Sequence, residues 1–332
     1  MAEKFRCYLV DKDAEGRCTG KVTERSVDDL PPGDVLIKVH YSSLNFKDAL
    51  SAQGHPGVTR KFPHVPGVDV AGEVVQSSSP LWKPGKQVIV TGHDQGQNTW
   101  GGFSQFARVP ASWVVALPDG ITLRDSMIYG TAGLTAALCI DALRVRGVTP
   151  ERGDVVVTGS TGGVGSVAVA ILAKLGYSVT AVTGKKSSHA YLKELGATTI
   201  IDRSEVNDPS NKPMLSERWA GAVDTVGGST LSTIVRSAKH RGVVTACGLV
   251  GGHELPLTVY PFILRGVDLV GIDTAEYPTE LRIPIWHRLA TTWKPQQLDS
   301  IATNIATLDN LAEEIEKIFR GKQTGRVVVR LI

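Results

Sequence analysis

The pattern of hydrophobic and polar positions changes near Thr122. Between Gly33 and Pro118, short runs of β-branched residues are separated by stretches rich in Gly and Pro, at residues 35–40, 71–75, 87–91 and 113–117. Short runs that end at turn residues are typical of a compact, largely antiparallel β domain. Residues 126–143 are instead rich in Ala, Leu, Ile and Met and predict a helix ending near Gly147. We therefore expect a domain boundary near Thr122.

Beyond this helix, apolar strand-like runs and helical patterns alternate. The strand-like runs are residues 154–158, 178–182, 199–201, 222–226, 242–247 and 268–272, and the helical stretches are 165–175, 189–195, 231–239 and 260–265. Such alternation predicts βαβ units and a doubly wound parallel sheet, so the fold class is α/β. A helix at 308–320 and a strand at 326–332 follow, and we expect this strand to return to the first domain.

Composition narrows the function classes. A chain of 332 residues suits two domains, and its 36 basic and 33 acidic residues are scattered, which argues against a nucleic-acid partner. The four cysteines, Cys7, Cys18, Cys139 and Cys247, are too far apart in sequence for a metal knuckle. Residues 1–10 carry charges and lack the apolar run of a signal peptide or membrane span. We expect a cytoplasmic enzyme that is not bound to a membrane.

A glycine-rich segment leads from a predicted strand directly into a predicted helix. Glycines there allow a tight turn, so that backbone N–H groups and the positive end of the helix dipole can hold a pyrophosphate. The segment is the strongest indication of dinucleotide binding in the chain. The predicted contact residues are Ser160, Thr161, Gly162, Gly163, Val164 and Gly165.

The end of the next strand indicates which dinucleotide is bound. NAD-binding domains place an Asp or Glu there for the ribose 2′-hydroxyl, whereas this chain has Thr183, Gly184 and Lys185. Hydroxyl and ammonium donors suit a 2′-phosphate, and Arg203 after the third strand is a second candidate for it. We therefore predict NADPH. The alternative is that Lys185 and the neighbouring Lys186 are only solvated charges at the start of a helix.

At this point the sequence resembles the zinc-free, quinone-oxidoreductase-like branch of the medium-chain dehydrogenase/reductase family, and most closely the acrylyl-CoA reductases. The resemblance covers nearly the whole chain and rests on residues 41–50, 66–72, 130–136, 159–165, 219–227 and 261–265. It implies a GroES-like, β-rich catalytic domain at 1–122, a Rossmann NADPH-binding domain at 123–275 and a return to the catalytic domain at 276–332. It also implies a homodimer joined through the edge strand 268–272.

The ligands of the catalytic zinc are missing from this sequence. Zinc-dependent relatives place a cysteine within the segment that here reads Asn45 to Asp48, and a histidine where this chain has Val68. Residues 93–107 contain no cysteine, so the structural zinc lobe is missing as well. We expect no metal site and no metal-assisted alcohol oxidation.

The resemblance instead implies hydride delivery to the β-carbon of an activated alkene, with protonation of the α-carbon. An enolate then develops on the carbonyl oxygen, and neutral donors near it lower the barrier. Asn45 is our first candidate donor. Lys47 and Asp48 are expected to form an ion pair that is either catalytic or structural, and Tyr41 is either a proton donor or a core residue.

Further cofactor contacts follow from the resemblance alone. Phe46 stands where the family often has tyrosine, and we expect it to pack near the nicotinamide. Leu249 and Ile263 are expected to contribute backbone contacts. Thr274 follows the last strand of the sheet, and Arg326 is expected to reach a cofactor phosphate or the substrate carbonyl.

Three functions remain open at this stage. Arg60 and Lys61 favour a small enoyl-CoA, most simply acrylyl-CoA, because the phosphates of CoA need basic partners. A quinone reductase would use the same hydride donor with a flat apolar substrate. A non-catalytic, crystallin-like NADPH-binding protein is the alternative outside enzymes.

Overall fold

The computed structural model describes residues 3–210 and 212–332, and the chain divides into two compact units. The first combines the chain up to Thr131 with Thr274–Thr291 and Ala302–Ile332, and the second combines Ala132–Asp273 with Thr292–Ile301. These limits differ from the expected ones at two places. The first crossing lies inside helix α2 (Leu123–Val145) rather than at its start, because the first turns of α2 pack in the first unit. Residues 292–301, expected in the catalytic domain, belong to the second unit.

The first unit is built on a seven-stranded sheet with the order β14-β15-β3-β4-β5-β7, in which β6 also pairs with β3. The terminal strand β15 returns to the first unit, as expected from the sequence, and pairs there antiparallel with β3. Its strands are β3 (Val35–Ser43), β4 (Asp69–Ser77), β5 (Gln87–Thr91), β6 (Phe106–Val109), β7 (Val115–Ala116), β14 (Ala302–Thr307) and β15 (Arg326–Arg330).

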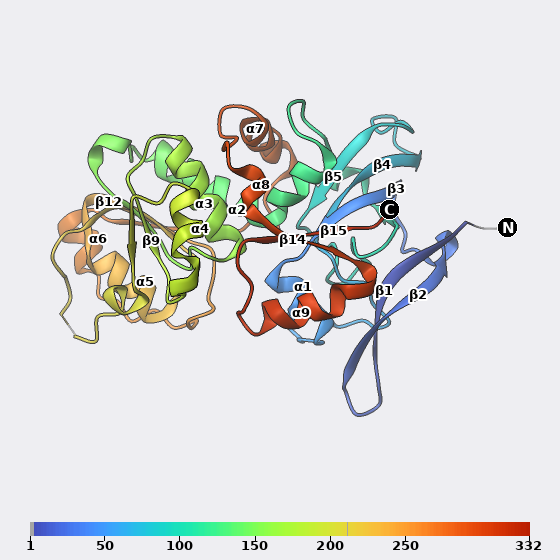
Figure 1. The fold of residues 1–332 in the computed structure, drawn as a ribbon, viewed down its shortest axis with the longest axis horizontal. Coiled ribbons are helices and arrows are strands. Elements are labelled where there is room, and N and C mark those ends of the chain that lie inside the picture. Colours follow the sequence, from blue (N-terminus) through green and yellow to red (C-terminus); the bar gives the residue numbers. More distant parts are fainter. Residues whose placement is uncertain (1–2, 211) are drawn as a thin grey trace. The chain divides into compact units, whose positions relative to one another are not determined.

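An N-terminal hairpin of the same unit was not predicted. It consists of β1 (Lys4–Lys12) and β2 (Cys18–Ser26), and its turn projects away from the sheet (Figure 1). Strand β2 is mostly polar and has no buried position, so it shows no alternation of apolar and polar residues. Strand β1 contributes Phe5, Cys7 and Leu9 to the core.

The second unit holds a six-stranded parallel sheet with the order β10-β9-β8-β11-β12-β13. Chain order runs outward from β8 in both directions, which confirms the doubly wound arrangement. Strand β13 lies at the edge, whereas the expected pairing of two subunits there stays a prediction. The strands are β8 (Val155–Val157), β9 (Val179–Val182), β10 (Thr199–Ile201), β11 (Trp219–Asp224), β12 (Ala238–Ala246) and β13 (Asp268–Gly271).

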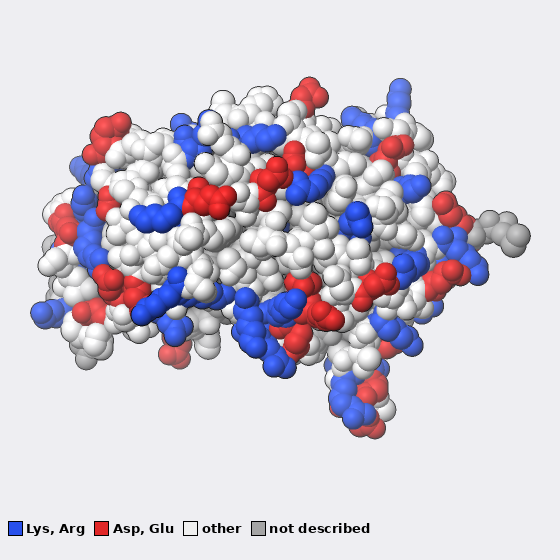
Figure 2. Space-filling view, in the orientation of Figure 1, with Lys and Arg blue, Asp and Glu red and all other residues white. Residues whose placement is uncertain are grey.

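The remaining helices connect the strands or cover the sheets (Figure 1). They are α1 (Phe46–Ala52), α3 (Gly163–Lys174), α4 (His189–Glu194), α5 (Gly228–Arg236), α6 (Tyr260–Arg265), α7 (Thr279–Ala290), α8 (Leu298–Ile301) and α9 (Leu311–Phe319). Helix α7 was not predicted, because it contains Pro284 and buries an arginine, Arg282. Helix α2 is long and apolar enough to cross a bilayer, but 89% of its most apolar window is buried in the protein, as in a core helix. Figure 2 shows basic and acidic side chains interspersed on the face drawn.

Candidate active site

The glycine-rich turn of the second unit leaves the start of α3 available to a ligand. Strand β8 ends at Val157, and α3 begins at Gly163 with Gly162 as an N-cap that has no side chain to satisfy the first N–H groups. Gly159 adopts a left-handed conformation with φ of 57°. A Cβ atom at Gly165 would overlap the carbonyl oxygen of Gly159, so the helix approaches the turn closely only because residue 165 is a glycine.

Within this turn, only part of the predicted contact set faces outward. Gly162, Gly163 and Val164 are partly exposed, whereas the side chains of Ser160 and Thr161 are buried. The Ser160 hydroxyl donates to the carbonyl of Val157 at 2.6 Å and accepts from the N–H of Val182 at 2.8 Å. This hydroxyl therefore joins β8 to β9, and the backbone of residues 162–164 is the part that suits a phosphate.

The residues predicted to bind the 2′-phosphate lie at one turn after β9. The Thr183 hydroxyl accepts from the N–H of Lys185 at 3.0 Å and so orders the turn. A Cβ atom at Gly184 would lie 3.1 Å from Nε of Arg203, which places this guanidinium directly over the glycine. Partial burial lowers the pKa of Lys185. Two cationic side chains from separate loops thus converge on one turn, as a 2′-phosphate would require.

In the first unit, the candidate catalytic segment begins helix α1. Asn45 is the N-cap, and the Asp48 carboxylate accepts from its backbone N–H at 2.8 Å. The other oxygen of Asp48 accepts from the backbone N–H groups of Gly67 at 3.2 Å and Val68 at 2.9 Å. Asp48 is fully buried, and burial, followed by repulsion from the Asp69 carboxylate, raises its pKa from 3.8 to about 7.

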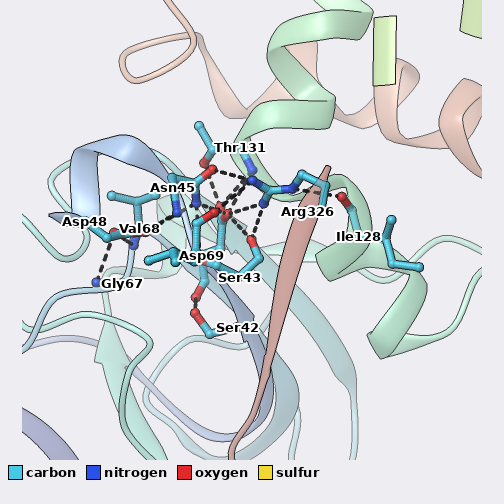
Figure 3. A network of polar contacts seen from close by, with 11 residues as sticks. Ser42, Ser43, Asn45, Asp48, Gly67, Val68, Asp69, Ile128, Thr131 and Arg326 are labelled. Atoms are coloured by element: carbon cyan, nitrogen blue, oxygen red, sulfur yellow. Dashed lines mark hydrogen bonds and ion pairs between the residues drawn. The ribbon is translucent and has the colours of Figure 1, made fainter. Parts of the chain in front are cut away.

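The centre of this region is the Asp69 cluster, which we define as Ser43, Asn45, Asp69, Thr131 and Arg326 (Figure 3). The Asp69 carboxylate accepts from the Ser43 hydroxyl at 2.6 Å, the Asn45 amide at 2.7 Å and the Thr131 hydroxyl at 2.6 Å. Arg326 lies 3.8 Å from the same carboxylate. Neither Asp69 nor Arg326 is more than 2% exposed, so this is a buried and densely hydrogen-bonded ion pair.

Asn45 and Arg326 are hydrogen-bonded to each other and to neighbouring protein groups. The Asn45 amide nitrogen donates to Asp69, and its oxygen accepts from Nη1 of Arg326 at 3.1 Å. Arg326 also donates to the carbonyls of Leu44 at 2.9 Å and Ile128 at 3.1 Å. Both side chains are therefore hydrogen-bonded to protein groups in this structure, and their roles toward a cofactor or a substrate stay predictions.

The expected ion pair between Lys47 and Asp48 does not form. Asp48 is buried and faces backbone N–H groups, whereas Lys47 is partly exposed and has no ion pair or hydrogen bond with a residue that the structure describes. The Tyr41 side chain, also partly exposed, likewise makes no hydrogen bond within the described residues. Phe46 is 41% exposed at the start of α1, as a ring that packs against a ligand would be.

The other residues predicted to contact a ligand differ widely in solvent exposure. Arg60 and Lys61 are exposed, and Nε of Arg60 donates to the carbonyl of Pro56 at 3.1 Å. Leu249 and Ile263 are 66% and 68% exposed, so neither is a core residue. Thr274 is buried, and its carbonyl accepts from Arg282 at 3.2 Å. Their roles as ligand contacts stay predictions.

Asp69, Ser43 and Thr131 were not predicted as site residues. The sequence held one signal for Asp69, because a carboxylate between Val68 and Val70 in an apolar run must be paired if the run is buried. The partners could not be found in the same way, since they come from β3, the residue before α1, α2 and β15. Among the described residues, no group of three or more His, Cys, Asp or Glu side chains could hold a metal ion. The segment Asn45 to Asp48 contains no cysteine and residue 68 is a valine, so these positions do not fit a catalytic zinc.

Two family models match the chain. The alcohol dehydrogenase GroES-like domain matches residues 31–119, and the zinc-binding dehydrogenase domain matches residues 163–289. The chain is 47% identical over 326 residues to acrylyl-CoA reductase AcuI of Ruegeria pomeroyi, covering 98% of each chain. It is 42% identical to YhfP of Bacillus subtilis, which is named provisionally as a quinone oxidoreductase, over 100% of each chain.

Solved structures agree with these sequence relatives. The yhdH oxidoreductase of Salmonella enterica in complex with NADP has a TM-score of 0.95 and 43% identity, covering 99% of this chain and 100% of that one. Bacillus subtilis yhfP with NAD bound has a TM-score of 0.97 and 42% identity, covering 99% and 100%. The chain is therefore an oxidoreductase of the medium-chain dehydrogenase/reductase family and belongs to the branch that contains the quinone oxidoreductase-like proteins and the acrylyl-CoA reductases.

Proposed function

We propose that the protein reduces the C=C bond of a small enoyl-CoA, acrylyl-CoA being the first candidate, with NADPH as the reductant. The observation that carries this proposal is the 47% identity with an acrylyl-CoA reductase over 98% of both chains. The site supports it, because Asn45 and Val68 leave no zinc chemistry to activate an alcohol. The reaction then depends on binding, orientation and charge stabilisation by the chain itself.

The second unit would hold NADPH through two separate features. The backbone N–H groups of residues 162–164 and the start of α3 face the pyrophosphate, and Lys185 and Arg203 pair with the 2′-phosphate. NADPH supplies the hydride that reduces the alkene. The choice of NADPH over NADH is part of the proposal, because the two similar structures hold NADP and NAD respectively.

The first unit would manage the charge that develops on the substrate. As the β-carbon is reduced, negative charge moves to the thioester oxygen, and the α-carbon then takes up a proton. Because the Asn45 amide is already hydrogen-bonded to Asp69 and Arg326, the donors left for the substrate are Lys47 and Tyr41. We assign Lys47 to the developing enolate, since an ammonium group stabilises it more strongly than a phenol does. Exposed Arg60 and Lys61 would serve the phosphates of CoA.

The decisive experiment follows NADPH consumption with acrylyl-CoA, crotonyl-CoA and a benzoquinone at equal concentrations. We expect the highest kcat/KM with acrylyl-CoA, and a Lys47→Ala variant should lose most of its kcat with that substrate. A Lys61→Ala variant should raise the KM for the CoA esters while leaving quinone turnover unchanged. If NADPH is not consumed with any of the three acceptors, the result would support a non-catalytic NADPH-binding protein instead.

A quinone oxidoreductase is the second candidate, favoured by the similarity to YhfP. Quinone reduction needs no contact with CoA phosphates. A higher kcat/KM with the quinone than with either thioester would favour the quinone oxidoreductase.

A further inference from the structure

Helix α2 is broken at Gly130, where φ is 51° and ψ is −155°. In an unbroken helix the N–H of Thr131 would donate to the carbonyl of residue 127, and the carbonyl of Ile128 would accept from the N–H of residue 132. A break removes both bonds, and buried backbone groups left without partners are costly. Other groups must therefore satisfy the two ends that face each other at Gly130.

The Asp69–Arg326 pair supplies these partners (Figure 3). The Asp69 carboxylate accepts from the N–H of Thr131 at 2.9 and 3.0 Å, and Nε of Arg326 donates to the carbonyl of Ile128 at 3.1 Å. The signs also suit the helix dipoles, with the anion at the start of the second half and the cation at the end of the first. A Cβ atom at Gly130 would overlap the Asp69 carboxylate and the Ser43 hydroxyl, so the break packs directly on these side chains.

The same pair holds Asn45 from both sides. Asp69 accepts from the Asn45 amide at 2.7 Å, while Arg326 donates to the Asn45 amide oxygen at 3.1 Å. The Ser43 hydroxyl donates to Asp69 at 2.6 Å and accepts from Nη2 of Arg326 at 2.6 Å, which bridges the two charges. Asn45 is only 8% exposed and is the N-cap of α1, and its side chain makes no capping hydrogen bond to the helix. The bonds to Asp69 and Arg326 instead anchor the residue that directly precedes Phe46 and Lys47.

We propose that Asp69 is a positioning residue for the reduction: through Asn45 it fixes the start of α1, and with it Phe46 and Lys47, against the broken helix α2. The inference rests on the proposed function, since it assigns Asp69 to the same reaction. Asp69 itself touches neither substrate nor cofactor in this role. Its carboxylate instead joins one end of the α2 break to the segment that carries the candidate catalytic side chains.

A double-mutant cycle tests the proposal with whichever of acrylyl-CoA, crotonyl-CoA and benzoquinone the wild-type enzyme reduces fastest. Asp69→Asn and Asn45→Ala should each lower kcat by about 10²-fold, the usual cost of misplacing catalytic groups. The KM for NADPH should change much less. If Asp69 acts through Asn45, the double variant should be no slower than the slower single variant by more than about threefold. The proposal would be overturned if the decrease in kcat of the double variant equalled the product of the two single decreases. It would also be overturned if Asp69→Asn kept the wild-type kcat.

Two further variants keep the proposal testable if Asp69→Asn does not fold. Thr131→Val removes the hydroxyl bond to Asp69 and keeps the backbone N–H of residue 131 as a donor, and it should show a smaller decrease in kcat that is likewise not additive with Asn45→Ala. Ser42→Ala is the matched control, because the Ser42 hydroxyl donates to the backbone carbonyl of Asp69 at 2.7 Å rather than to its carboxylate. It should retain wild-type kcat. If Asp69→Asn does not fold, the test is the double variant of Thr131→Val and Asn45→Ala. A decrease in its kcat equal to the product of the two single decreases overturns the proposal.

These outcomes separate the two proposals. If the effects of Asp69→Asn and Asn45→Ala are independent in an enzyme that prefers acrylyl-CoA, only the proposed role of Asp69 is contradicted. If the two effects are coupled in an enzyme that prefers the quinone, only the proposed substrate is contradicted. An enzyme that reduces none of the three acceptors contradicts both.

Discussion

The candidate cofactor site of the second unit lies within one continuous segment, residues 155–165, with two cations added from the turns that follow β9 and β10. The Asp69 cluster of the first unit instead gathers side chains from β3, the N-cap of α1, β4, α2 and β15. The first site offers mainly backbone N–H groups, which are fixed as soon as the strand, turn and helix form. The second depends on side chains whose positions are set only when the whole unit is folded.

This difference should determine how each site responds to mutation. A backbone site tolerates changes of most side chains but not a change of backbone shape, so its glycines are its sensitive positions. A buried side-chain cluster is sensitive at every charged member, because removing one partner leaves the other charge unpaired. The predictions below test this contrast, beginning with the largest expected effect.

Gly165→Ala should nearly abolish NADPH binding. The added Cβ would overlap the carbonyl oxygen of Gly159, so the turn must move and the N–H groups at the start of α3 lose their alignment. Hydrogen bonds to charged groups are worth about 1.5 to 3 kcal/mol each, and losing two of them means at least about a hundredfold in Kd. NADPH fluorescence titration measures this. The control is Gly271→Ala, where a Cβ meets nothing within 4 Å; equal affinities of the two variants would contradict a backbone site.

The double variant Lys185→Ala and Arg203→Ala should have a smaller and selective effect. The KM for NADPH should rise about ten- to a hundredfold, because two charge-assisted contacts are lost at a partly exposed position. NADH has no 2′-phosphate, so its KM should stay nearly unchanged. Lys186→Ala, an exposed neighbour, serves as the control. If NADPH and NADH weaken equally, the pair holds the turn rather than the phosphate.

The same contrast explains what the sequence could predict. The doubly wound sheet and its strands follow from local periodicity, and the structure confirms them together with the expected return of the terminal strand to the first unit. The polar hairpin β1–β2 and the Pro284-containing α7 have no such periodicity. At the site, the glycine-rich turn was visible because its function lies in consecutive residues. The partners of Asp69 were not visible, because Ser43, Thr131 and Arg326 meet only through tertiary packing.

A titration of Asp48 should reveal the electrostatic strain of the buried side-chain region. Its pKa is raised to about 7, so between pH 4 and pH 7 the folded state keeps a proton that the unfolded chain has released. The stability that Asp48 contributes should therefore fall as pH rises through this window, by on the order of 2 kcal/mol between pH 5 and pH 8.

Urea unfolding of the wild type and of Asp48→Asn at these two pH values measures this effect. The variant loses acceptors and should be less stable throughout, but its disadvantage should shrink toward pH 8. Asp119→Asn, which changes an exposed carboxyl group, is the surface control. A disadvantage that grows with pH would mean that the three backbone N–H donors outweigh burial and keep Asp48 charged.

The smallest expected effect is that of metal removal. In zinc-dependent relatives, coordination holds the region that here contains Asn45 and Val68. In this chain the Asn45 amide is held by Asp69 and Arg326, and the N–H of Val68 is held by the Asp48 carboxylate. Because protein hydrogen bonds alone make these contacts, prolonged dialysis against EDTA should leave kcat unchanged, while a zinc-dependent alcohol dehydrogenase treated in parallel should lose activity. Metal analysis of the purified protein should find no stoichiometric zinc. Activity that disappears with EDTA and returns with zinc would mean that a metal organises the first unit, and the Asp69 cluster would then be secondary to it.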